Sequence, residues 1–244
     1  MGQGVYWVQD FTHLEGKEVG GVELSRLLEI SPGVTALIGS GGKTTAMYVL
    51  AGELACRGTV LCCTTTHIRR PGHMPVLLQP TEEALSAALK ARRCVCAGAP
   101  AEAGKLTAPA IPMARLAELA DFVLVEADGS RGLPLKAHLP HEPVIPSEAS
   151  QVILLAGASG LGRPVSEAVH RPERFCQLSG LSESDLVTPQ ALAAVLRQEA
   201  LAGKVLVNQA EDGGAMAGAK ALAALLEARV FAGALRRREW TCLS

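Results

Sequence analysis

Short apolar runs alternate with helical patterns along most of the chain. Uniformly apolar or β-branched runs predict buried strands at 34–38, 59–64, 93–97, 122–125, 152–156, 204–207 and 230–232. Apolar residues at helical spacing predict helices at 22–30, 43–57, 81–92, 112–120, 188–198 and 213–229. Strands that alternate with helices are typical of an α/β fold with a mainly parallel sheet.

The most informative stretch joins the first predicted strand to the second predicted helix. Three glycines in four positions follow the strand, and the helical pattern begins at Lys43. Glycines let consecutive backbone N–H groups converge on one point, and the helix adds its positive amino-terminal end. This order predicts a phosphate-binding loop, with Lys43 contacting the β- and γ-phosphates and Thr44 helping to hold Mg²⁺. The predicted nucleotide-binding residues here are Gly39, Ser40, Gly41, Gly42, Lys43, Thr44 and Thr45.

This loop is shorter than the usual phosphate-binding consensus. The consensus places a glycine five residues before Gly42, where this chain has Leu37. An ordinary glycine-rich turn between a strand and a helix is the alternative interpretation. The strand before the turn and the helix after it favour nucleotide binding, with ATP or GTP as the ligand.

Acidic residues interrupt the apolar strand at 122–125. Glu126 and Asp128 follow it, and residues two apart face the same way if the strand continues. Carboxylates at the end of a strand beside a phosphate-binding loop can hold Mg²⁺ through oxygen ligands and water. We therefore expect Thr44, Glu126 and Asp128 to bind the metal and Lys43, Glu126 and Asp128 to take part in catalysis. A strand end entering solvent is the alternative.

Two further stretches carry polar groups suited to an acceptor. Thr66 and His67 follow the predicted strand at 59–64, and ligands of open parallel sheets bind beyond the carboxyl ends of strands. Arg131, Lys136 and His141 lie in a proline-containing loop after the acidic pair. We expect His67 to be catalytic and the other four residues to bind the substrate. Solvated side chains are the alternative in both stretches.

Asn208 ends the predicted strand at 204–207. The stretch from Asn208 to Asp212 resembles the base-reading element of GTPases, although Gln209 replaces the lysine and Glu211 takes the aspartate position. We expect Asn208 to contact the base or ribose. The stretch does not choose between guanine and adenine.

Composition narrows the class of protein. Apolar residues make up 48% of the 244 positions, which is enough for a core, and the net charge is −1 from 23 basic and 24 acidic residues. This balance favours neither nucleic acid nor an acidic membrane as a partner. No apolar run approaches the roughly 18 residues that cross a bilayer, and the amino terminus lacks signal-peptide features. We expect a cytoplasmic protein and, without repeats or long linkers, one domain over 1–244.

The seven cysteines do not predict disulfides in a chain of this kind. Four of them lie in predicted buried strands, where small apolar roles are favoured over a metal site. Because Cys94 and Cys96 share one strand face, their role stays open.

Taken together, these motifs resemble those of the YqeC family, a group associated with the maturation of selenium-dependent molybdenum hydroxylases. The resemblance rests on the glycine-rich loop, the acidic pair and further segments in the same order, namely 39–45, 64–68, 125–131, 133–137, 141–146, 169–171 and 208–212. It implies a single three-layer P-loop NTPase-like domain. It also implies an accessory role in which the chain acts with a molybdenum hydroxylase or its cofactor-handling proteins.

The reaction is not fixed by this resemblance. Mg²⁺-dependent hydrolysis of ATP or GTP, or phosphoryl transfer, is the leading hypothesis. A non-catalytic, nucleotide-switched chaperone that carries molybdenum cofactor or selenium to a client is a second one. The loop also resembles the Gly-Thr-Asn-Gly-Lys-Thr loop of Mur ligases, so a small-molecule kinase or ATP-dependent ligase is a third.

Overall fold

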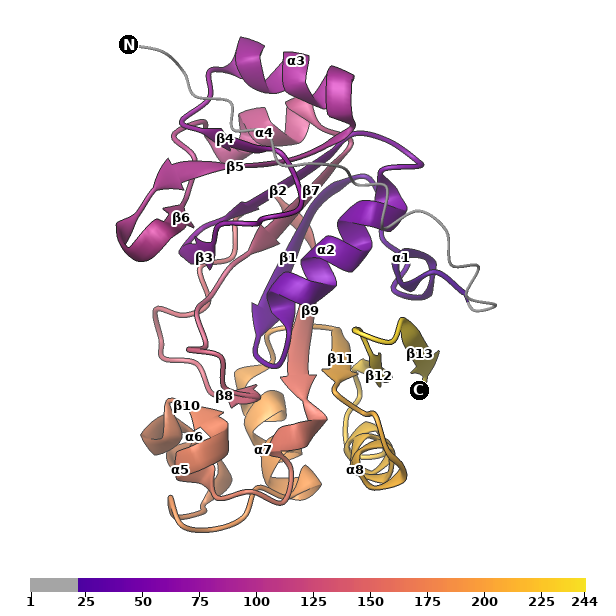
Figure 1. Cartoon of the computed structure of the whole chain (residues 1–244). Coiled ribbons are helices and arrows are strands. Elements are labelled where there is room, and N and C mark those ends of the chain that lie inside the picture. Colours follow the sequence, from indigo (N-terminus) through magenta and orange to yellow (C-terminus); the bar gives the residue numbers. More distant parts are fainter. Residues whose placement is uncertain (1–21) are drawn as a thin grey trace. The chain divides into compact units, whose positions relative to one another are not determined.

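The computed structural model describes residues 22–244, which divide into two compact units (Figure 1). Among these residues, unit 1 contains 22–36, 47–128 and 144–151. Unit 2 contains 37–46, 129–143 and 152–244. Three elements contain a boundary between the units, namely β1 (Gly33–Gly39), α2 (Lys43–Leu54) and β9 (Ala149–Gly157). The single domain expected over 1–244 stays a prediction. The amino-terminal sequence, which lacks signal-peptide features, lies outside the described residues.

Unit 1 is built on short parallel strands with helices packed against them. Its remaining elements are α1 (Leu24–Leu27), β2 (Val60–Thr64), β3 (His67–Arg69), β4 (Val76–Leu78), α3 (Glu82–Arg92), β5 (Cys94–Pro100), η2 (Glu102–Gly104), β6 (Lys105–Thr107), α4 (Met113–Leu119) and β7 (Phe122–Glu126). Strand β2 pairs in parallel with β7 and β5, and β5 also pairs in parallel with β4. Strand β6 runs antiparallel to β5 and β3.

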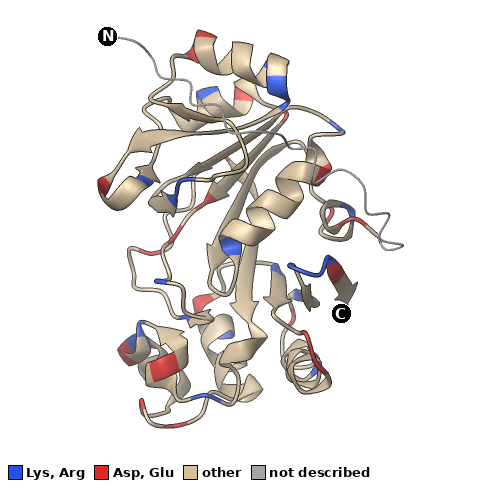
Figure 2. Cartoon of the chain, in the orientation of Figure 1, with Lys and Arg blue, Asp and Glu red and all other residues tan. Residues whose placement is uncertain are grey.

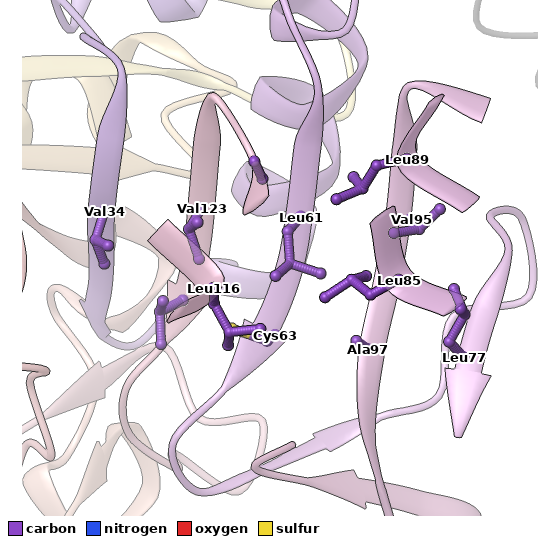
Figure 3. Close-up of a cluster of buried hydrophobic side chains, with 12 residues drawn as sticks. Val34, Leu61, Cys63, Leu77, Leu85, Leu89, Val95, Ala97, Leu116 and Val123 are labelled. Carbon is purple, nitrogen blue, oxygen red and sulfur yellow. The ribbon is translucent and has the colours of Figure 1, made fainter. Parts of the chain in front are cut away.

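The core of unit 1 forms where α3 and α4 cover the strands (Figure 3). Leu85 and Leu89 come from α3 and Leu116 from α4, and all three pack among strand residues such as Leu61 and Val123. Burial of each large side chain contributes about 1.5–3 kcal/mol, so this cluster holds the helices on the sheet. Helix α3 begins as the sequence predicts, because the Thr81 hydroxyl accepts a hydrogen bond from Ala84 N.

Unit 2 has its own parallel strands and helices. Its remaining elements are β8 (Leu135–Lys136), η3 (Ala158–Gly160), α5 (Val165–Ala168), β10 (Val169–His170), α6 (Pro172–Ser179), α7 (Pro189–Glu199), β11 (Lys204–Asn208), α8 (Gly213–Ala223), β12 (Arg229–Ala234) and β13 (Glu239–Cys242). Strand β11 pairs in parallel with β9 and β12, and β13 runs antiparallel to β12. A separate parallel pair joins β8 and β10.

The α/β class with a mainly parallel sheet is confirmed, and each predicted strand is present. The structure adds several strands that the sequence pattern did not indicate, namely β3, β4, β6, β8, β10 and β13. Each of these strands has only two to four residues, too few for alternation or an apolar run to be distinguished from loop. The helix predicted over 22–30 is reduced to α1, which has four residues.

Basic and acidic residues both occur in each of the two units (Figure 2), and the net charge of the whole chain is −1. Among residues 22–244, no helix combines the length and apolar character needed to span a membrane.

Candidate functional site

The glycine-rich loop lies in unit 2, between the end of β1 and the first turn of α2. Gly41 and Gly42 have φ values of +83° and +126°, which residues with a side chain rarely adopt. A Cβ atom on Gly41 would lie 2.3 Å from Gly157 N, and one on Gly42 would lie 2.4 Å from the Asn208 amide nitrogen. Backbone conformation and close packing therefore both require glycine here. Such turns direct consecutive backbone N–H groups into a concave anion-binding surface.

Lys43 extends back over this loop. Its Nζ donates to Gly39 O at 2.6 Å and to Ser130 Oγ at 3.3 Å, and the residue is only 3% exposed. An ammonium group held this way presents a positive charge at the mouth of the loop. Its bonds to a carbonyl and a hydroxyl can be exchanged for charge-assisted bonds to phosphate oxygens.

Ser40 anchors the loop to the rest of unit 2. Its N–H donates to Leu155 O at 2.8 Å, and its hydroxyl donates to Leu133 O. These two bonds give Ser40 an anchoring role, and the contact with the nucleotide that the sequence suggested stays a prediction.

Asn208 supports the loop from β11. Its Nδ2 donates to Gly41 O at 2.7 Å, and its Oδ1 accepts from Leu235 N at 3.0 Å. The residue is buried. The amide thus fixes the loop conformation, and the contact to base or ribose that the sequence suggested stays a prediction.

The acidic pair lies in unit 1, at the end of β7. Glu126 and Asp128 are both buried, and Glu126 is in register with Thr64 of β2. The Thr64 hydroxyl donates to Glu126 O at 2.7 Å and accepts from Thr66 N at 3.0 Å. Unit 1 therefore brings Thr66 together with the acidic segment, as expected for neighbouring parallel strands. Because Thr44 belongs to unit 2, the shared Mg²⁺ site stays a prediction.

His67 is not at the end of β2, where the sequence placed it. It is exposed on β3, in register with Thr107 of β6. The chain turns at 65–66 and then starts the short strand β3. The run of threonines gave no indication of this turn.

The proposed substrate residues in unit 2 have different environments. Arg131 and His141 are exposed. The Lys136 side chain is fully buried, with Nζ donating to Gly129 O at 2.7 Å and lying 3.3 Å from Glu142 Oε2. Arg171 completes the group, with Nη2 2.8 Å from Glu142 Oε1.

Glu142 is the acceptor at the centre of this group. Burial alone would raise its pKa, but the hydrogen bond from Arg171 and the charge of Lys136 lower the pKa to about 2. Sequence reasoning missed Ser130, Glu142 and Arg171, although all three lie in or beside segments that carry the family resemblance.

Four buried cysteines lie on the neighbouring strands β2 and β5 of unit 1. Cys62 is in register with Cys96 across β2 and β5, and Cys94 is also buried. Burial raises the pKa of Cys63 to about 12 and raises the pKa of Cys96 further, which keeps these thiols protonated. Residues 22–244 contain no group of three or more His, Cys, Asp or Glu side chains arranged to hold a metal ion.

Comparisons with known proteins agree on one family. The model of a family described as YqeC protein matches residues 35–173. A relative from Escherichia coli (strain K12), described as uncharacterized protein YqeC, is 38% identical over 174 residues, which are 68% of each chain.

The chain is also similar to a solved structure, the signal recognition particle 54 kDa protein from Aeropyrum pernix K1 in complex with GDP. The TM-score is 0.40 at 17% identity, and the match covers 87% of this chain but 44% of that one.

Proposed function

The chain belongs to the YqeC family, and we propose that its loop at 39–45 binds the phosphates of ATP or GTP. The position of Lys43 carries this proposal. Its ammonium group lies over a turn that two left-handed glycines form, directly before α2. Backbone N–H groups, a helix amino terminus and a cation at one point suit a polyphosphate better than any neutral ligand.

Mg²⁺ is proposed to accompany the nucleotide. Thr44 supplies a hydroxyl, and Glu126 and Asp128 supply carboxylates, which are the hard oxygen ligands that Mg²⁺ prefers. When bound, the ion would neutralise negative charge on the phosphates. The assignment of these ligands rests on the sequence pattern.

We propose Mg²⁺-dependent hydrolysis or phosphoryl transfer as the reaction. Phosphoryl transfer leaves the protein mainly positioning and charge stabilisation to perform, and Lys43 suits both tasks. Thr66, His67, Arg131 and His141 are proposed to act on the acceptor. Lys136 is proposed to act indirectly, because its buried ammonium holds Glu142.

The cellular role that we propose follows from the family resemblance. The chain would act as a cytoplasmic maturation factor for a selenium-dependent molybdenum hydroxylase, with that enzyme or its cofactor-handling proteins as partner. Turnover measured with and without the client would distinguish a hydrolase from a switch that waits for its partner.

The decisive experiment replaces Lys43. Calorimetry with ATP and GTP, each with Mg²⁺, should show binding to the wild-type chain and at least about tenfold weaker binding to Lys43→Ala, because charge-assisted hydrogen bonds are lost. Lys220→Ala on α8 is the control, since that lysine is exposed. Equal affinities for wild type and Lys43→Ala would refute the proposal.

A further inference from the structure

The segment 129–136 contacts the glycine-rich loop and also lines a pocket, all within unit 2. Toward the loop, Ser130 Oγ accepts from Lys43 Nζ, and Leu133 O accepts from the Ser40 hydroxyl. Toward the pocket, Arg131 and Leu133 form part of the wall. A ligand in this pocket would therefore lie one short segment away from the proposed phosphate site.

The pocket has a volume of about 240 Å³. The rest of its wall comes from α5, β10 and the start of α6, with Ser166, Val169, His170 and Arg171 among the lining residues. Sites for drug-sized ligands usually measure about 300–1,000 Å³, so this pocket suits a smaller molecule.

Three basic and two acidic side chains lie in or beside this pocket. Arg131 and Arg171 line it, and Lys136 is in register with His170, which also lines it. The Glu142 carboxylate holds Arg171 through two hydrogen bonds at 2.8 and 3.4 Å. Glu173 is an acidic group in the wall, and it is exposed.

The pKa of His170 reflects its burial and the basic groups around it. Burial lowers its pKa, and the charges of Lys136, Arg171 and Arg131 lower it further against the opposing effect of Glu142. Its imidazole is therefore neutral near pH 7 and can donate or accept a hydrogen bond.

Both pocket arginines have unusual backbone conformations. Arg131 has φ of +50° and Arg171 has φ of +70°, in the left-handed region that non-glycine residues seldom adopt. Such conformations persist where the surrounding structure imposes them, and they cluster at functional sites.

We propose that this pocket binds the oxyanion group, phosphate or carboxylate, of a small organic molecule. Arg131 and Arg171 recognise the oxyanion through their planar, multiply donating guanidinium groups. Leu133 and Val169 supply apolar wall for the organic part. A role for this molecule as the acceptor in the nucleotide reaction rests on the proposed function, whereas its binding to the pocket does not.

The test separates the pocket from the phosphate loop by using the full-length Lys43→Ala chain. Calorimetric titration with inorganic phosphate should still show one site, and phenyl phosphate should bind more tightly because it also covers apolar wall. Adding Arg131→Gln or Arg171→Gln should weaken phenyl phosphate binding by about tenfold or more. Adding Arg163→Gln should change nothing, since Arg163 is exposed and outside the pocket wall.

Thermal melting of each variant shows whether it is folded. Arg131 is exposed, so Arg131→Gln keeps the test valid if Arg171→Gln is unstable. A folded Lys43→Ala chain that binds neither probe would overturn the proposal, as would unchanged binding in Arg131→Gln. If phenyl phosphate bound no more tightly than inorganic phosphate, the proposal that the ligand carries an organic group would be wrong. Loss of nucleotide binding in Lys43→Ala is read separately and tests only the phosphate loop.

Discussion

Replacing Glu142 with glutamine should destabilise unit 2 in a pH-dependent way. The carboxylate joins Arg171 to Lys136, whose side chain is fully buried, and Glu142 itself is 15% exposed. Glutamine keeps the size of the side chain but removes its charge. One partner of a buried ion pair is thereby lost, which is more costly than losing a surface pair.

The size of the effect follows from the pKa of Glu142, which falls from 4.5 to about 2 on folding. At about 1.36 kcal/mol for each pH unit, this difference corresponds to about 3 kcal/mol of stability at pH 7. Because the folded pKa is the lower one, the stabilisation is complete above about pH 4.5 and is lost as the pH falls toward 2. By the same relation, about 2 kcal/mol of it is lost between pH 7 and pH 3.

Urea unfolding followed by Trp240 fluorescence, with Trp7 replaced by phenylalanine, measures the effect. Glu142→Gln should lower the free energy of unfolding by about 3 kcal/mol at pH 7 and by about 1 kcal/mol at pH 3. Glu167→Gln is the matched control, since Glu167 forms an exposed pair with Arg163 and should matter by less than about 1 kcal/mol. A difference for Glu142→Gln that stayed constant between pH 7 and pH 3 would refute this electrostatic account.

Three further predictions concern the loop and the thiols. Asn208→Ala should lower stability by about 1–3 kcal/mol in urea unfolding, because Gly41 O and Leu235 N lose their buried partner; an unchanged midpoint would contradict the loop-anchoring role. Gly41→Ala should lower the melting temperature, whereas Gly52→Ala, in open space on α2, should raise stability by up to about 1 kcal/mol; equal effects would contradict the conformational argument. A thiol reagent at pH 8 should label the exposed Cys56 and Cys242 rapidly and the four buried cysteines only after unfolding; rapid labelling of all would contradict their burial.

The predictable part of the fold is the part with long, uniform patterns. Strands such as β7 are buried on both faces and therefore appear in the sequence as unbroken apolar runs. The start of α3 could be placed because Thr81 caps it locally. Strands β8 and β10 could not be found, since each has two residues and exists only through its pairing with the other.

The candidate site likewise has a part that the sequence could predict and a part that it could not. The glycine-rich loop is local in sequence, so its conformation could be anticipated from its glycines. The support from Asn208 depends on a contact 167 residues along the chain, and only the folded structure contains it. The same holds for Arg171, which a distant carboxylate orients.

The interleaving of the two units along the chain affects how the protein can be dissected. The chain passes from one unit to the other within β1, within α2, after Asp128, after Pro143 and within β9. Each of the two units therefore consists of several separate stretches of the chain. No single truncation can release either unit intact, and a fragment ending after Asp128 would carry the glycine-rich loop without Ser130, Leu155 or Asn208. Studies of individual parts should therefore use point substitutions in the whole chain.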